Sequence, residues 1–172
     1  GFGTIHERLG LLDTLFMFAY AVGLYASGWL TDHTNPRLTS AAGLAASAFL
    51  IATFSAAGLM GVHTLGAYAA LWGLNGLVQS AGWPANVAVM GLWFPRSSGD
   101  RGGVFGLWTS NSSVGNIIGT LVVLLFLGRG WEASLLAVAG LCFGQALLTA
   151  FFLQTRPPEG VVASDPAVEP AK

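Results

Sequence analysis

Charged residues are scarce in this chain. Only 9% of its 172 residues are Asp, Glu, Lys or Arg, whereas soluble domains usually carry about 25%. A soluble fold is excluded, because its buried helices would have almost no polar surface left to cover them. The net charge of -1 and the dispersed basic residues give no reason to expect a nucleic-acid partner.

Cysteine is nearly absent, and the groups that catalysis requires do not occur together. The single cysteine, Cys142, excludes an intrachain disulfide. All three histidines fall in predicted loops or at the terminus, away from Ser110 and Ser112, so no buried base activates a serine. The sequence holds no Cys/His metal cluster, no paired membrane carboxylates and no phosphate-binding loop with its Lys. We therefore expect no enzyme, no metal site and no cofactor.

Long apolar runs are what the chain does have. Mean hydropathy is +0.65, and about 20 apolar residues in a helix match a hydrocarbon core of about 30 Å. Five runs reach that length and predict an all-α membrane protein with five transmembrane helices, over residues 12–30, 38–59, 67–94, 103–127 and 133–153. Residues 1–153 thus form one five-helix bundle, and residues 154–172, rich in Pro, Glu, Val and Ala, form a cytoplasmic linker or disordered tail.

The loops predict an orientation. Basic residues are enriched on the cytoplasmic side of membrane proteins. Alternating loops place Arg37, Arg96, Arg101, Arg156 and Lys172 on one side, and Arg8 and Arg129 on the other. The first group is therefore predicted to be cytoplasmic, so that the chain starts outside and ends inside. The absence of an initiator Met indicates that it begins within a longer protein.

Small residues predict where the helices approach each other, since lipid offers no hydrophobic drive for their association. Ala19, Gly23 and Ser27 recur every four residues in the first span, and Gly115 and Gly119 do so in the fourth. Both stripes predict close contacts. Asp13, near the start of the first span, is expected to cap its helix.

Polar residues line one face of the third span. Asn75, Gln79, Gly82 and Asn86 share that face, Trp83 lies beside it, and Pro84 predicts a kink there. Such residues often form only interhelical hydrogen bonds, worth about 0.6 kcal/mol each, but this combination favours a water-filled path. An adjoining face of the fourth span holds Trp108, Asn111, Ser112 and Gly115, and Tyr20 of the first span could join them.

Four segments resemble the major facilitator superfamily. The pattern Gly28-x-x-x-Asp32 followed by Asn35-Pro36-Arg37 is similar to its loop between the second and third helices. Residues 75–84 (NGLVQSAGWP) resemble the fourth helix of its organophosphate:phosphate antiporters. Residues 101–116 resemble the fifth helix, and residues 12–20 the second helix of the eukaryotic sugar-phosphate exchanger branch.

The resemblance implies the fold and the function. The chain would supply helices two to six of an amino-terminal half, as a fragment of a carrier that exchanges a sugar phosphate or other organophosphate for inorganic phosphate by alternating access. The first helix with its phosphate-binding Arg, and the carboxy-terminal half, would be its missing partners. The implied cavity residues are Tyr20, Gln79, Trp83, Asn86, Asn111 and Ser112, and the implied gating residues are Gly28, Asp32, Arg37 and Arg101.

One observation keeps a second hypothesis open. No predicted span holds an Arg or Lys near its middle, and a phosphate dianion in a membrane cavity needs compensating cations. The alternative is therefore a non-transporting membrane scaffold or regulatory subunit derived from half a transporter. Eukaryotic members of the branch often reside in the endoplasmic reticulum, although no retention signal occurs here.

Overall fold

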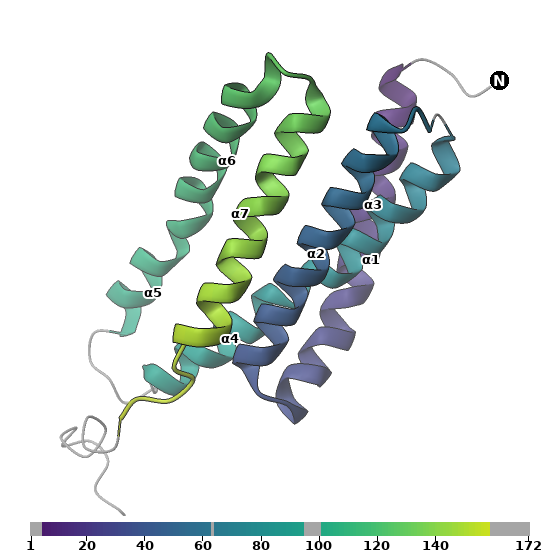
Figure 1. Cartoon of the computed structure of the whole chain (residues 1–172). Helices are drawn as coiled ribbons and strands as arrows, with labels where there is room; N and C mark the ends of the chain where they lie inside the picture. Colours follow the sequence, from purple (N-terminus) through teal and green to yellow (C-terminus); the bar gives the residue numbers. More distant parts are fainter. Residues whose placement is uncertain (1–4, 63, 95–100, 159–172) are drawn as a thin grey trace, which may run out of the picture.

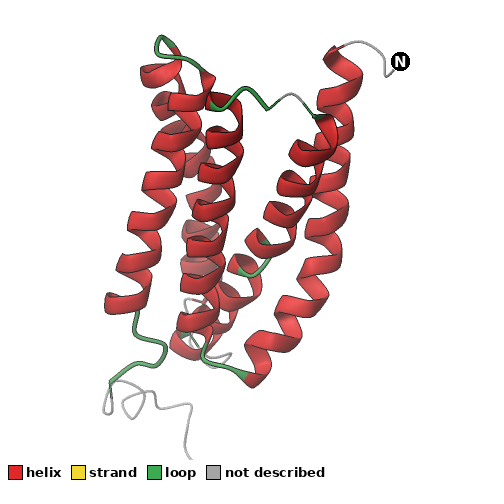
Figure 2. Ribbon diagram, turned by 45° about the vertical axis from the view of Figure 1, so that its right-hand side comes forward, coloured by secondary structure: helices red, strands yellow, loops and turns green. Residues whose placement is uncertain are grey.

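The computed structural model describes residues 5–62, 64–94 and 101–158, and every regular element in them is an α-helix (Figures 1 and 2). The side chain of Arg101 also lies outside the described part. The expected all-α class is confirmed. The helices are α1 (Ile5–His33), α2 (Pro36–Leu59), α3 (Leu65–Gln79), α4 (Gly82–Trp93), α5 (Arg101–Thr109), α6 (Asn111–Leu127) and α7 (Trp131–Phe152).

Four stretches of continuous helix are long and apolar enough to cross a membrane. They are Ile5–His33, Pro36–Leu59, Gly102–Leu127 and Trp131–Phe152, the third of which joins α5 and α6. The predicted span over residues 67–94 differs, because it is divided into α3 and α4 of 15 and 12 residues. These two helices follow one another from one end of the bundle to the other (Figure 2). The third predicted span therefore consists of two short helices.

Helix α2 has a capped start. Asn35 Oδ1 accepts from the Arg37 N–H at 3.0 Å, and Pro36 takes the first helical position. The capping role of Asp13 is wrong. Helix α1 already begins at Ile5, so Asp13 lies inside it as an exposed side chain.

Helix α2 lies at the centre of the packing. It contacts α7 on one side and α3 and α4 on the other, while α1 packs mainly on α3 and α6 packs on α7. Helices α5 and α6 therefore form the outer layer beyond α7 (Figure 1). No side chain of α6 is buried in the described structure. The bundle is thus dense around α2 and open along α5 and α6.

The helix ends agree with the predicted grouping of basic residues. The α1–α2 connection, the start of α5 and the end of α7 lie at one end of the bundle, and the start of α1 and the α6–α7 connection lie at the other (Figure 1). Trp93 Nε1 at the end of α4 donates to the Gln154 carbonyl beyond α7 at 2.9 Å, which ties two segments of the first end together. Arg96 and Lys172 lie outside the described residues. That the first end is cytoplasmic stays a prediction, as does the division at residue 153, since residues 159–172 are also outside.

Candidate functional site

The site expected on the third span surrounds the break between α3 and α4. Proline has no N–H and its ring collides with the carbonyl four residues earlier. For Pro84 that carbonyl belongs to Ser80, and the helix is interrupted there, at Ser80 and Ala81. The Ala81 N–H donates to the Val78 carbonyl at 3.3 Å, three residues back instead of four. The kink predicted from Pro84 is confirmed, one turn before the proline.

Glycines bring α1 against this break. A Cβ at Gly23 would collide with Ser80 Oγ and lie 2.8 Å from the Leu77 carbonyl oxygen. One turn before Ser80, a Cβ at Gly76 would collide with the carbonyl oxygen of Phe16. The close contact that the Ala19, Gly23 and Ser27 stripe predicts is therefore present, and it is made with the end of α3.

Two of the cavity candidates flank the break. Gln79 is the last residue of α3 and is exposed, and Trp83 lies in the first turn of α4 with 48% of its surface exposed. Asn86 follows one turn later, also exposed, and its Oδ1 accepts from Ser40 Oγ of α2 at 3.5 Å. The break thus sets the direction in which Trp83 and Asn86 extend relative to Gln79.

Asn75 does not belong to this exposed group. Its side chain is buried, and its Oδ1 accepts a 2.6 Å hydrogen bond from Ser47 Oγ of α2. The prediction that Asn75 lines a water-filled path is wrong. It holds α3 against α2, which is the interhelical role that polar membrane residues commonly have.

The candidates from the fourth predicted span lie at the start of α6. Asn111 and Ser112 are exposed, and Ser112 Oγ donates to Asn111 Oδ1 at 3.2 Å. They are linked to the α4 candidates through α5, because the rings of Trp83 and Trp108 lie 5.2 Å apart. The contact predicted for Gly115 and Gly119 is absent from the described structure, where a Cβ at either would meet nothing within 4 Å.

Tyr20 belongs to an aromatic cluster. It is half-buried, and its ring stacks on Phe16 at 6.2 Å, while Phe16 lies 5.5 Å from Trp72 of α3. Among the described residues, no hydrogen bond joins Tyr20 or Gln79 to another cavity candidate. A role for Tyr20 in a cavity stays a prediction.

The gating candidates do not form an ion pair in the part of the chain that the structure describes. Asp32 is exposed, Gly28 makes no close approach to another helix, and Nε of Arg37 is buried without a hydrogen-bond partner. Arg101 begins α5, and its side chain is not described. His33, next to Asp32, is bonded through Nδ1 to the Trp29 carbonyl at 2.7 Å.

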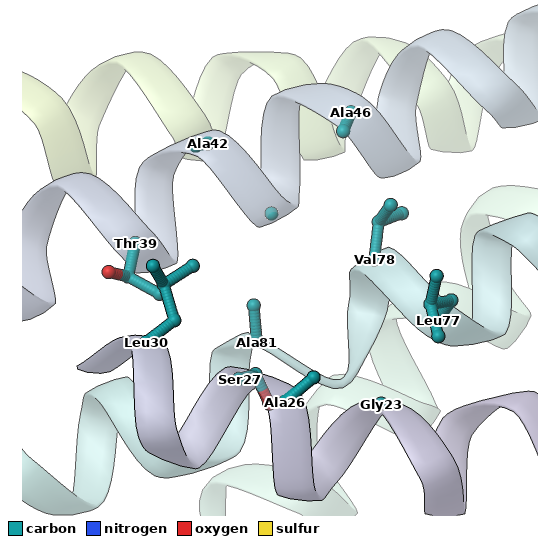
Figure 3. Close-up of a pocket in the computed structure, with 11 residues that line it drawn as sticks. Gly23, Ala26, Ser27, Leu30, Thr39, Ala42, Ala46, Leu77, Val78 and Ala81 are labelled. Carbon is teal, nitrogen blue, oxygen red and sulfur yellow. The ribbon is translucent and has the colours of Figure 1, made fainter. Parts of the chain in front are cut away.

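A cavity of about 350 Å³ lies between α1, α2 and the α3–α4 break (Figure 3). Its lining is almost entirely aliphatic, with two hydroxyls, those of Ser27 and Thr39. None of the cavity candidates from the sequence lines it. Since no charged group faces it, it cannot hold a phosphate dianion.

Ser27 and Ser80 are both buried, and the sequence prediction included neither among the cavity residues. Ser27 Oγ donates across helices to the Ser80 carbonyl at 3.3 Å and lies 3.5 Å from Ser80 Oγ. Part of the signal was present, since Ser80 stands four residues before Pro84 and its carbonyl must lose the usual helical donor. The identity of the new donor depends on the packing of α1.

The long apolar helices define a multi-pass helical membrane protein, and comparison with known proteins gives its family. A sequence profile of the Major Facilitator Superfamily matches residues 1–170, and the chain belongs to this superfamily. Its members are carriers and not enzymes, which confirms the expected non-enzymatic role. The all-α bundle is therefore part of a major facilitator fold.

Within this superfamily, the chain is similar to relatives named as exchangers of sugar phosphates. Sugar phosphate exchanger 3 of Xenopus laevis is 43% identical over 152 residues, and the Bos taurus protein of that name is 41% identical over 152 residues, each alignment covering 88% of this chain and 30% of the relative. Glucose-6-phosphate exchanger SLC37A2 of Danio rerio is 36% identical over 157 residues, or 91% of this chain and 31% of the relative. The chain thus spans about 30% of the length of these relatives. No solved structure gives a significant match.

Proposed function

We propose that this chain is part of a carrier that exchanges a sugar phosphate or another organophosphate for inorganic phosphate. The observation that carries the proposal is the 41–43% identity to proteins named sugar phosphate exchanger 3. That similarity runs through 88% of the chain. The chain would supply helices two to six of the amino-terminal half, and the exchange would proceed by alternating access.

The substrate path would pass the exposed polar residues on either side of the α3–α4 break. Gln79 and Asn86 offer amide donors and acceptors, and Trp83 with Trp108 forms an aromatic wall between α4 and α5. Asn111 and Ser112 extend the same surface at the start of α6. Neutral donors of this kind can orient a sugar or a phosphate oxygen, because a hydroxyl or phosphate oxygen accepts from amide N–H groups.

The compensating charge must come from elsewhere in such a carrier. The described basic residues Arg8, Arg37, Arg129 and Arg156 all lie near helix ends or in loops. A dianion held in a membrane needs cations close to it. We assign this role to the missing partners, a first helix upstream and a carboxy-terminal half, which would also cover the bare faces of α5 and α6. Asp32, Arg37 and Arg101 would act in gating at the cytoplasmic end.

The test is an exchange assay on the full-length gene product in liposomes loaded with inorganic phosphate and offered glucose 6-phosphate. Gln79→Ala and Trp83→Ala should each reduce uptake by about tenfold or more. A tenfold loss corresponds to about 1.4 kcal/mol, the energy of one or two polar or stacking contacts in total. Gln145→Ala is the matched control, since Gln145 is an exposed glutamine on α7 whose side-chain hydrogen bond in the described structure is to Thr149 of the same helix. Unchanged uptake in both test variants would remove Gln79 and Trp83 from the path.

No described membrane helix holds an Arg or Lys near its middle, and this favours a second candidate, a scaffold or regulatory subunit built from half a transporter. The two candidates differ in the sequence that flanks this chain in its gene. An upstream helix containing Arg and six downstream helices support the carrier, whereas a start codon near Gly1 and a stop codon after Lys172 support the scaffold. A fluorescent fusion of the gene product would test residence in the endoplasmic reticulum membrane, which we propose for a eukaryotic source.

A further inference from the structure

The α3–α4 break leaves a backbone carbonyl without its helical donor. In a continuous helix the Ser80 carbonyl would accept from the N–H of residue 84, but residue 84 is proline and has none. In the described part of the chain, no other backbone N–H donates to it. Ser80 is fully buried, and an unsatisfied carbonyl in a membrane protein interior is costly. Some other donor has to replace the missing one.

Ser27 of α1 is that donor. Its Oγ lies 3.3 Å from the Ser80 carbonyl oxygen and equally 3.3 Å from the Leu24 carbonyl in its own helix. A hydroxyl has a single proton, and the Leu24 carbonyl lies inside α1, where residue 28 supplies the usual helical N–H. The Ser80 carbonyl has no such N–H, so it gains more from the hydroxyl. Ser80 Oγ in turn donates to the Leu77 carbonyl at 2.6 Å.

The geometry leaves little freedom at this contact. Gly23, one turn before Ser27, lets α1 approach until a Cβ there would collide with Ser80 Oγ. Both serines are buried, at 7% and 0% exposure. Gln79 immediately precedes Ser80, and Trp83 immediately precedes Pro84. The bend that the Ser27 hydroxyl stabilises is therefore the bend that separates these two cavity candidates.

We propose that Ser27 is a positioning residue: by donating to the Ser80 carbonyl that Pro84 leaves unpaired, it fixes the angle between α3 and α4 and hence the spacing of Gln79 and Trp83. The hydrogen bond itself is independent of what the protein transports, whereas its effect on substrate rests on the proposed function. Removing the donor lets α4 reorient, so substrate binding weakens while the later steps of transport continue.

The experiment is a double-mutant cycle on the full-length gene product. Pro84→Ala restores an N–H that can donate to the Ser80 carbonyl, so the Ser27 hydroxyl loses its special role in that background. Hydrogen bonds measured in a membrane protein average about 0.6 kcal/mol with a maximum of about 1.7, or about 3-fold and about 16-fold in an equilibrium constant. Ser27→Ala should raise the unfolding equilibrium constant in detergent by about 3-fold to 16-fold in the parent protein, and by less than about 2-fold in the Pro84→Ala background.

Ser55→Ala is the matched control, because Ser55 Oγ also donates to a carbonyl of another helix, that of Glu132 at 2.8 Å, far from Pro84. Its effect must be the same in both backgrounds. Equal effects of Ser27→Ala in the two backgrounds would overturn the proposal, since they would show a packing role only. If Ser27→Ala does not fold, Ser27→Cys, which keeps the shape of the side chain with a slightly larger atom and a weaker donor, enters the same cycle with the same two outcomes.

Exchange kinetics supply the second measurement. Ser27→Ala should raise the KM for glucose 6-phosphate by about 3-fold or more and leave the maximal rate within about 2-fold, and Pro84→Ala should abolish that difference. A lower maximal rate at unchanged KM would contradict positioning. If the parent protein exchanges no organophosphate, the proposed function fails, while the unfolding cycle still decides whether Ser27 holds the break.

Discussion

Glycines at the junction of α1 with α3 lie against a neighbouring helix, whereas the glycines along α6 have no neighbouring helix against them in the described part of the chain. Gly23 and Gly76 lie so close to the opposing backbone that a Cβ would collide with it, but a Cβ at Gly115 or Gly119 would meet no atom within 4 Å. Both stripes look alike in the sequence. A stripe of small residues shows that a helix can be approached closely, and the partner that approaches it must be known separately.

The largest effect should come from filling a packed glycine. Gly76→Ala should destabilise the protein by about 1–3 kcal/mol, the usual cost of overpacking, because the new methyl collides with the Phe16 carbonyl. Gly119→Ala is the matched control and should stabilise the protein by up to about 1 kcal/mol, the preference of a helix for Ala over Gly, since the new methyl meets no atom of the described structure within 4 Å. Both positions are helical, so the intrinsic preference of a helix for Ala cancels between them. Unfolding in detergent measures both. A similar cost at both positions would mean that the α6 stripe is covered in the full-length protein.

The next effect compares two asparagines. Asn75→Ala should cost about 1–2 kcal/mol, because it leaves the buried Ser47 hydroxyl without its acceptor. Asn116→Ala, at an exposed position of α6, should cost much less. The same detergent titration applies. An equal or larger cost at Asn116 would show that α6 has a polar partner beyond the described residues.

The Trp83–Trp108 pair connects the two regions and can be measured by a double-mutant cycle. Aromatic pairs contribute about 0.5–1.5 kcal/mol beyond the area that they bury. Trp83→Ala and Trp108→Ala should therefore show a coupling energy within that range, since their rings are 5.2 Å apart. Trp29 of α1, which stacks on His33, supplies the control pair with Trp83 and should show no coupling. Additive effects of Trp83→Ala and Trp108→Ala would show that the two rings do not interact and that this pair does not hold α4 to α5.

Span length and position were predictable because the bilayer fixes them. A run of about 20 apolar residues is needed to cross it, and four of the five predicted runs contain a single continuous membrane helix or, for α5 and α6, one joined span. Pro84 also predicted the bend correctly, since the loss of an N–H is a local property. The carbonyl that loses its helical donor lies one turn earlier, at Ser80. It follows from Pro84 only through the helical rule that residue i donates to the carbonyl of residue i−4.

The neighbour that each polar side chain contacts was less predictable from the sequence. Asn75 and Gln79 are four residues apart on one face of α3, yet Asn75 is buried against Ser47 and Gln79 is exposed. Asn75 is covered because Ser47 of α2 lies against it, whereas Gln79 ends α3 at the break. Ser27 carried no local signal for its bond to Ser80, 53 positions away. Contacts of this kind depend on how helices distant in sequence pack.

The smallest expected effect tests how α6 is held to the bundle. Ser134 Oγ of α7 donates to the Val123 carbonyl of α6 at 3.1 Å, and Ser134 is buried. Ser134→Ala should cost about 0.6 kcal/mol, the average for a hydrogen bond in a membrane protein. Ser112→Ala removes a hydroxyl whose hydrogen bond in the described structure stays within α6, to Asn111, and it should cost less. Detergent unfolding measures both, and the difference isolates the contact between helices. If Ser112→Ala costs as much as Ser134→Ala, a segment outside the described residues contacts the exposed start of α6. The contrast between the packed α1–α3 junction and the bare face of α6 would then hold for this chain by itself and not for the assembled protein.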